Sequence, residues 1–115
     1  MILDPTNDLE EIKIALKIDS DDDDAAVKRS TIAAISYIKG AIGSDKPSFY
    51  VQEETELLNL AIIMLADHFY HARSATIESS TSYGSLREYD LGFTSILWQL
   101  KADYSLFMGG DSIGG

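Results

Sequence analysis

Five aspartates lie within six residues, and carboxylates at that density could bind a hard cation such as Ca²⁺. They are Asp19, Asp21, Asp22, Asp23 and Asp24. A calcium loop counted from Asp19 needs glycine at its sixth position and glutamate at its twelfth, where this chain has Asp24 and Ser30. Aspartates at a helix start accept backbone N–H bonds and meet the positive end of the helix dipole, for about 0.3–1 kcal/mol each. We therefore favour a helix start with a solvated acidic face over a metal site.

Two histidines, His68 and His71, are one helical turn apart and could hold a zinc ion. Such a site needs a third and usually a fourth ligand, and the chain has no other histidine and no cysteine. The order Asp67-His68 also differs from a His-Glu-x-x-His motif, in which the acid follows the first histidine. A structural role is favoured, with the histidines and Tyr70 hydrogen-bonded to loop backbone. A minor metal-dependent enzyme ranks last among the readings.

Motifs for nucleophilic catalysis or phosphate binding are missing from the sequence. There is no Gly-x-Ser-x-Gly elbow, and the one glycine cluster, at the C-terminal end, has no helix after it. The chain is therefore expected not to be an enzyme, with no catalytic residue, no cofactor and no bound metal.

Composition narrows the class of protein further. The 115 residues predict one domain, and 19 acidic against 9 basic residues give a net charge of −10. Residues 1–24 carry −7 of it. Affinity for nucleic acid through its phosphates comes from Lys and Arg, so that function is disfavoured. The longest apolar stretch, Leu57–Ala66, is about half of a membrane span. With no leader peptide expected and no cysteine, we expect a soluble intracellular protein that does not bind membranes.

Four segments have helical periodicity. The first follows Pro5, with Thr6 or Asn7 as N-cap, and leaves Lys13 facing water. The second runs from the aspartates to about residue 42, where Gly43 could form a left-handed C-cap. The third spans about 53–73 and is apolar nearly all round in its middle, which is typical of a bundle centre or a subunit contact. The linker between the second and third contains Phe49 and Tyr50, which we expect to pack back on the bundle.

The last helix is expected from Thr94 to about Phe107, after a long polar loop over residues 74–92. That loop could hold a short strand pair, around 75–80 and 87–91. Residues 108–115 are rich in glycine and are expected to form a flexible tail. The predicted fold class is therefore all-α: a small bundle of about four helices in one domain, residues 1–107, followed by the tail.

Large apolar groups exceed what a four-helix core of this size requires. Tyr, Trp, Phe and Met are enriched in protein interfaces, although a place in the core stays open as the alternative for each. We take the following as the predicted interface residues: Tyr83, Leu86, Tyr89, Leu91, Phe93, Trp98, Phe107 and Met108.

Three segments carry a resemblance. The first is Leu9-x-x-Ile12-x-x-x-Leu16-x-Ile-Asp19-x-Asp-Asp-Asp-Asp-Ala25, continued by Ala33-Ala-x-x-Tyr37-Ile38 and a glycine. The second is Ala61-Ile-x-x-Leu65-Ala-x-x-Phe-Tyr70-x-x-Arg73, and the third is Gly92-Phe-Thr-Ser-Ile96-Leu-Trp-Gln-Leu100-Lys101. In this order they resemble the head–tail connector (adaptor) proteins of tailed bacteriophages. The chain departs from that family in having Asp90-Leu91-Gly92 where a proline is frequent, and Lys101 where arginine is common.

The resemblance implies a structural virion protein, made in the host cytoplasm and then placed at the head–tail junction. It implies a ring of about twelve or thirteen copies with head-to-tail contacts, bound to the portal protein and to a tail-completion (stopper) protein. DNA would pass through without sequence-specific binding, and Asp21–Asp24 could line the channel. The alternatives are a small acidic DNA mimic that inhibits a DNA-binding enzyme, and a helical protein-binding module.

Overall fold

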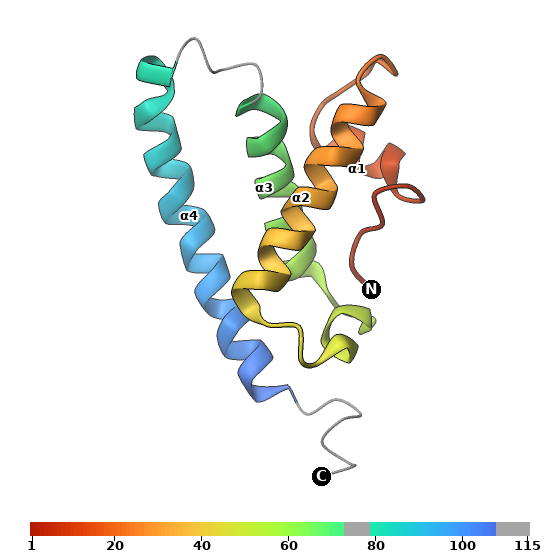
Figure 1. The fold of residues 1–115 in the computed structure, drawn as a ribbon, viewed down its shortest axis with the longest axis vertical. Coiled ribbons are helices and arrows are strands. Elements are labelled where there is room, and N and C mark those ends of the chain that lie inside the picture. The colour runs from red at the N-terminus through yellow and green to blue at the C-terminus, as the bar shows by residue number, and fades with distance from the viewer. Residues whose placement is uncertain (73–78, 108–115) are drawn as a thin grey trace.

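The computed structural model describes residues 1–72 and 79–107, with 79–91 described by their backbone alone. Four α-helices and one 3₁₀ helix occur in these ranges (Figure 1). They are α1 (Leu9–Ala15), α2 (Asp24–Ile42), η1 (Pro47–Val51), α3 (Glu56–Ala72) and α4 (Ser79–Leu106). No strand occurs in the described residues, and the predicted all-α class is confirmed.

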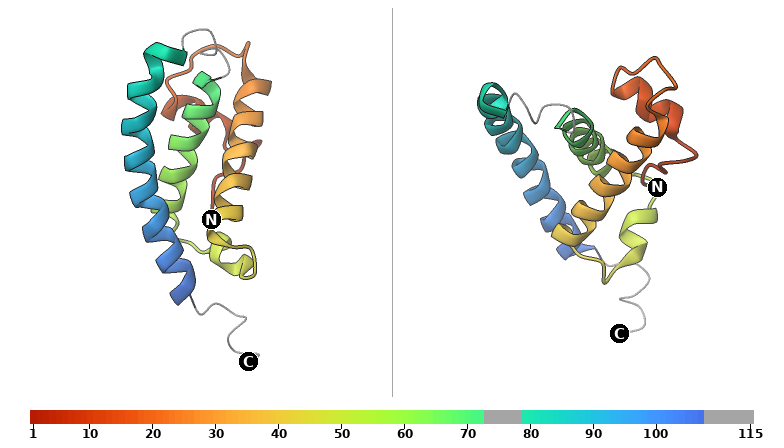
Figure 2. Two further views of the ribbon diagram at one scale, coloured as in Figure 1. Left: turned by 60° about the vertical axis from the view of Figure 1, so that its left-hand side comes forward. Right: turned by 45° about the horizontal axis from the view of Figure 1, so that its top comes forward.

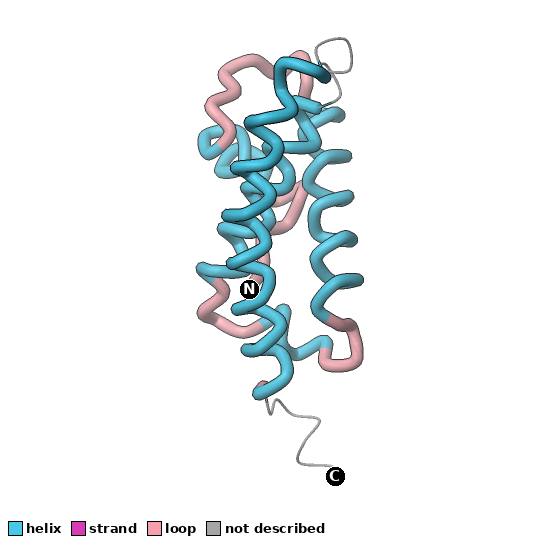
Figure 3. Tube along the Cα trace, turned by 90° about the vertical axis from the view of Figure 1, so that its left-hand side faces the viewer, coloured by secondary structure: helices cyan, strands magenta, loops and turns pink. Residues whose placement is uncertain are grey.

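Helices α2 and α3 form the centre of the bundle. In Figure 1 and the right-hand view of Figure 2, α4 lies on one side of this pair, and α1 with the N-terminal segment lies on the other. The tube in Figure 3 shows the helices joined by short loops in the described part. One core connects the elements, and the side chains of Ile12, Val27, Ile38 and Ile62 are almost completely buried in it. The buried residues of α2 and α3 recur every three or four positions, so the helical periodicity of the sequence decides which side chains enter the core.

The N-terminal segment is fixed to the start of α3. The Leu3 backbone N–H donates to Asn59 Oδ1 at 3.1 Å, and the Thr55 hydroxyl donates to the Met1 carbonyl at 2.8 Å. These bonds hold residues 1–3, which form no helix, against the start of α3.

The linker aromatics pack into the bundle as expected. Phe49 and Tyr50 are both 4% exposed. The Phe49 ring meets the rings of Tyr104 and Phe107 edge-on, with centroids 5.1 and 5.5 Å apart. This aromatic cluster joins η1 to the end of α4, in the edge-to-face geometry that aromatic pairs prefer.

Gly43 ends α2 at a position that strongly favours glycine. Its φ of 139° lies where L side chains are strained, and a Cβ there would be 2.7 Å from Tyr104 Cε1. Its ψ is 155°, so the residue adopts a positive-φ conformation that is essentially confined to glycine, and the expected left-handed helical cap is wrong. The close approach of the Tyr104 ring explains the need for glycine.

The main correction to the fold concerns residues 74–92. The expected loop is helical from Ser79, so α4 has 28 residues rather than about fourteen. Residues 87–91, expected as one arm of a strand pair, are helical, and most of the other arm lies outside the described residues, as does the predicted tail, 108–115. Serine and threonine are only weakly unfavourable in helices, and Gly84 costs about 1 kcal/mol. A helix already formed over 93–106 therefore extends at little cost.

Candidate functional site

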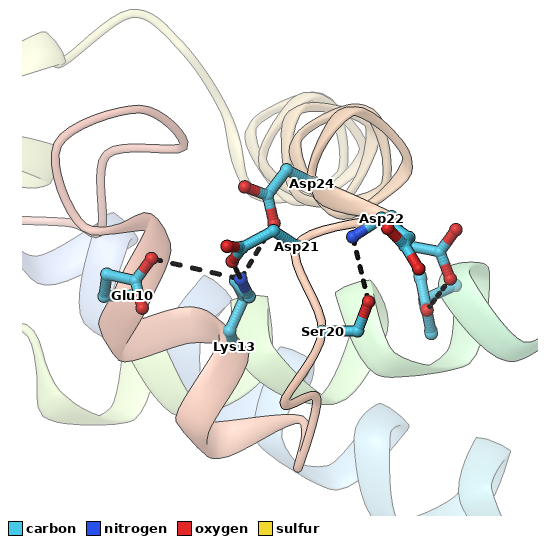
Figure 4. Close-up of polar contacts among 8 residues, drawn as sticks. Glu10, Lys13, Ser20, Asp21, Asp22 and Asp24 are labelled. Carbon is cyan, nitrogen blue, oxygen red and sulfur yellow. Dashed lines mark hydrogen bonds and ion pairs between the residues drawn. The ribbon is translucent and has the colours of Figure 1, made fainter.

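The aspartate segment surrounds a buried lysine. Lys13 was expected to face water, but its side chain is only 3% exposed. Its Nζ lies 2.6 Å from Asp21 Oδ1, 2.9 Å from Asp24 Oδ1 and 3.9 Å from Glu10 Oε1 (Figure 4). A buried ammonium requires such partners, because its desolvation is otherwise costly. We call Lys13, Asp21 and Asp24 the lysine–aspartate cluster.

The electrostatics of this cluster favour its charged form. The hydrogen bond from Lys13 lowers the pKa of Asp21 below its ordinary value. The bonds to Asp21 and then to Asp24 raise the pKa of Lys13, against an opposing effect of burial. The site that a metal ion could occupy between these carboxylates is therefore held by the protein's own cation, which joins α1 to the start of α2.

The remaining aspartates have separate surroundings. The Asp22 backbone N–H donates to Ser20 Oγ at 2.9 Å, and the Tyr70 hydroxyl donates to Asp23 Oδ2 at 2.5 Å. Asp23 is the N-cap residue of α2 but makes no side-chain cap hydrogen bond, so that expected role is wrong for it. Asp19 and Asp22 are exposed. The segment thus lies at a helix start as expected, but it is held there by Lys13 and Tyr70.

The two histidines do not converge on a common point with other ligands. His71 Nδ1 lies 3.0 Å from Asp67 Oδ1, one turn earlier on α3, and both side chains are at least half exposed. Across the described ranges, 1–72 and 79–107, no group of three or more His, Cys, Asp or Glu side chains is placed to hold a metal ion. His71 Nδ1 also lies 2.9 Å from the Asp67 backbone oxygen within α3. The loop that follows, residues 73–78, lies outside the described residues, so the expected bond from histidine to loop backbone stays a prediction.

Two tyrosines, Tyr50 and Tyr104, make hydrogen bonds with the backbone at the C-terminal end of α2 and in the loop after it. Burial, followed by the nearby Tyr104, raises the pKa of Tyr50 to about 12, so its hydroxyl stays protonated and donates to the Gly43 carbonyl. The Lys46 backbone N–H donates to the Tyr104 hydroxyl oxygen at 2.6 Å. These bonds fix α4 against the end of α2 and so set which face of α4 points outward.

The predicted interface residues have three different positions. Trp98 is 70% exposed, whereas Phe93 is 4% exposed and Phe107 packs on Phe49. The side chains of Tyr83, Leu86, Tyr89 and Leu91, and all of Met108, lie outside the described residues. Phe93 and Phe107 thus contribute to the core of the single subunit, and any role between subunits stays a prediction.

Sequence reasoning missed an apolar surface that lies on the other side of the molecule from Trp98. Ile32 is 56% exposed on α2, and Val51 and Met1 are 60% and 69% exposed beside it. Ile32 lies off the buried stripe formed by Val27, Thr31 and Ala34, and that offset was the available signal.

A family model matches residues 6–101 of the chain, under the description "Phage gp6-like head-tail connector protein". The chain belongs to this family. The match extends from the turn before α1 into the second half of α4, and it confirms the resemblance seen in the three sequence segments. No curated protein and no solved structure matches the chain. No helix in the described part of the connector is long and apolar enough to cross a membrane.

Membership gives the connector its general role, that of a structural protein of the phage head–tail junction. Its described surface agrees with assembly, since it leaves large apolar side chains in contact with water on more than one face.

Proposed function

We propose that the connector forms a closed ring of about twelve or thirteen copies between portal and tail, with head-to-tail contacts around the ring. The ring extends the DNA channel and offers a platform to the tail-completion protein. Assembly takes place in the host cytoplasm, and the ring then remains in the virion.

The observation that carries this proposal is the exposure of large apolar side chains on two sides of one subunit. Trp98 on α4 and Ile32 on α2 are each more than half exposed. Large exposed apolar patches mark interaction surfaces, and tryptophan is enriched among the residues that dominate binding energy. A ring needs two such surfaces per subunit, because each copy has two neighbours.

The charge of the chain suits a DNA conduit. A net charge of −10 gives little attraction for phosphates, so DNA can slide through without being retained. The exposed Asp19 and Asp22 are the members of the aspartate segment most available to face a channel, because Asp21 is paired with Lys13. Replacing Asp19 and Asp22 by lysine should slow DNA passage, measured as genome ejected per particle, and normal ejection would contradict this placement.

Light scattering of the purified connector, with and without portal protein, tests the ring. Across a concentration series at low and moderate salt, we expect a discrete species near twelve or thirteen times 12.6 kDa. A monomer at every concentration, together with failure to bind portal, would overturn the proposal.

A further inference from the structure

A groove of about 540 Å³ lies between the N-terminal segment and α2. Its apolar lining consists of Met1, Ile2, Leu3, Pro5, Ile32, Ile35 and Val51. The two charged side chains on it are those of Asp4 and Lys39. Most of the lining is therefore apolar, and three of its members are more than half exposed.

The outer face of α4 carries a ridge of the opposite shape. Trp98, Ala102 and Leu106 follow one another at four-residue spacing, so they form one line about 12 Å long. Trp98 and Leu106 are 70% and 77% exposed, while Leu100 and Tyr104 bury the other side of the helix. The ridge is thus an apolar surface on a helix whose inner face is already occupied.

Ridge and groove lie on different sides of the molecule. Figure 1 shows α4 at one edge and the N-terminal segment toward the other, with α2 and α3 between them, and the right-hand view of Figure 2 agrees. One chain therefore cannot place its ridge in its own groove. Two copies can, and the pair keeps one free ridge and one free groove, which is the requirement for a head-to-tail series.

Each surface carries one charge of each sign, Lys101 and Asp103 beside the ridge and Asp4 and Lys39 on the groove, so opposite charges can meet in one alignment of the two. Lys101 flanks the ridge, with its Nζ 5.8 Å from the centroid of the Trp98 ring. The exposed Asp4 flanks the groove, where its side chain accepts the backbone N–H groups of Thr6 and Asn7. Between subunits that each carry −10, such an attraction favours one orientation of the contact.

We propose that the Trp98–Ala102–Leu106 ridge of one connector subunit docks into the groove between residues 1–5 and α2 of the next subunit. The inference rests on the ring proposed above and specifies its contact. A second copy of this chain is the occupant to which the shapes and charges point.

The chain contains no cysteine, so an introduced pair can report the contact without background. Ala102→Cys places a thiol on the ridge and Ser36→Cys places one in the groove, both at exposed positions that leave the large apolar side chains intact. Equal amounts of the two variants, distinguished by a tag on one of them, are mixed and oxidised. We expect disulfide-linked heterodimers about tenfold more abundant than either homodimer.

Two controls make this measurement specific. Ser44→Cys, exposed outside both surfaces, should crosslink to Ala102→Cys only at the level of random pairing. Adding Trp98→Glu to the ridge chain should abolish the heterodimer, whereas Gln99→Glu, the same charge change one residue along, should preserve most of it.

The outcomes separate the contact from the ring. Random pairing of the ridge and groove thiols overturns the contact whatever the mass of the wild-type protein, and a wild-type ring mass would then leave the proposed function intact. Selective heterodimers support the contact even where light scattering shows no closed ring, in which case the ring proposal fails alone.

Discussion

The lysine–aspartate cluster and the ridge on α4 use their side chains in opposite ways. The cluster draws two carboxylates of the chain's densest run of charge, those of Asp21 and Asp24, onto the buried ammonium of Lys13. The ridge has few charges and would pass for part of a core, yet Trp98 is 70% exposed. A conspicuous motif is thus partly satisfied within its own subunit, while an inconspicuous apolar stripe stays exposed.

The largest effect is expected from two aromatic residues of α4 that lie five positions apart. Phe93→Ala should lower the free energy of unfolding by about 3–5 kcal/mol, because it opens a cavity at a side chain that is 4% exposed. Trp98→Ala should change it by no more than about 0.5 kcal/mol. Urea denaturation of both variants checks this. A cost for Trp98→Ala as large as that for Phe93→Ala would place the ridge in the core.

Substitution of Gly43 tests whether the end of α2 holds the inner face of α4, opposite the ridge. Gly43→Ala should cost about 1–3 kcal/mol, since the new Cβ meets the Tyr104 ring and the backbone is strained. Gly40→Ala is the matched control, because nothing lies within 4 Å of a Cβ there and alanine favours a helix. Thermal melts should rank the two variants on opposite sides of the wild type. Equal melting temperatures would show that the end of α2 does not hold α4.

A smaller effect is expected from Lys13→Met, since Asp21 keeps most of its contact with water after the lysine is removed. The folded pKa of Asp21 is lowered, so the stability that it contributes is present above its unfolded pKa and is lost as the pH falls through the folded value. The raised pKa of Lys13 makes its contribution persist below its unfolded pKa, up to about pH 10.

The melting temperature of Lys13→Met should therefore lie below that of the wild type at a constant difference from about pH 5 to pH 9. The difference should narrow below about pH 4. Lys17→Met, at an exposed lysine four residues after Lys13 and just beyond the end of α1, provides the control. A difference that stays constant down to pH 2 would show that the lysine stabilises through packing alone.

The smallest effect is expected from Glu10→Gln. Its carboxylate lies 3.9 Å from Lys13 Nζ and its side chain is 82% exposed, so the pair contributes at most about 0.5 kcal/mol. Chemical denaturation at low and high salt measures this loss of stability. A loss above about 1 kcal/mol would mean that Glu10 belongs to the cluster as fully as Asp21.

Periodicity predicted the core of this connector better than it predicted its polar contacts. The stripe on α2 could be read directly, because its apolar spacing indicates which helix face is buried, whereas the middle of α3 is apolar nearly all round. Lys13 could not, since its burial depends on the chain turning back at Lys17, where φ is 61°, so that Asp21 and Asp24 reach it. The first half of α4 was missed because its Ser, Thr and Gly residues carry no stripe and helix propagation from its second half decides the structure.

The predicted interface residues likewise include some whose positions could be predicted and some whose positions could not. Trp98 was expected at a surface and lies at one, while Phe93 has the same aromatic character and lies in the core. A single sequence does not distinguish them, because the bundle needs one face of α4 and the choice of face is set by contacts such as that of Tyr104 with Gly43. The groove beside α2 depends on where the N-terminal segment lies, which no local pattern specifies.

The most direct test of assembly through the exposed face of α4 is the mass of the wild-type connector in the presence of portal protein, measured side by side with that of Trp98→Glu. We predict a discrete ring for the wild type, and for the variant a folded monomer with an unchanged circular dichroism spectrum. Rings of equal mass and stability from both proteins would contradict assembly through the exposed face of α4.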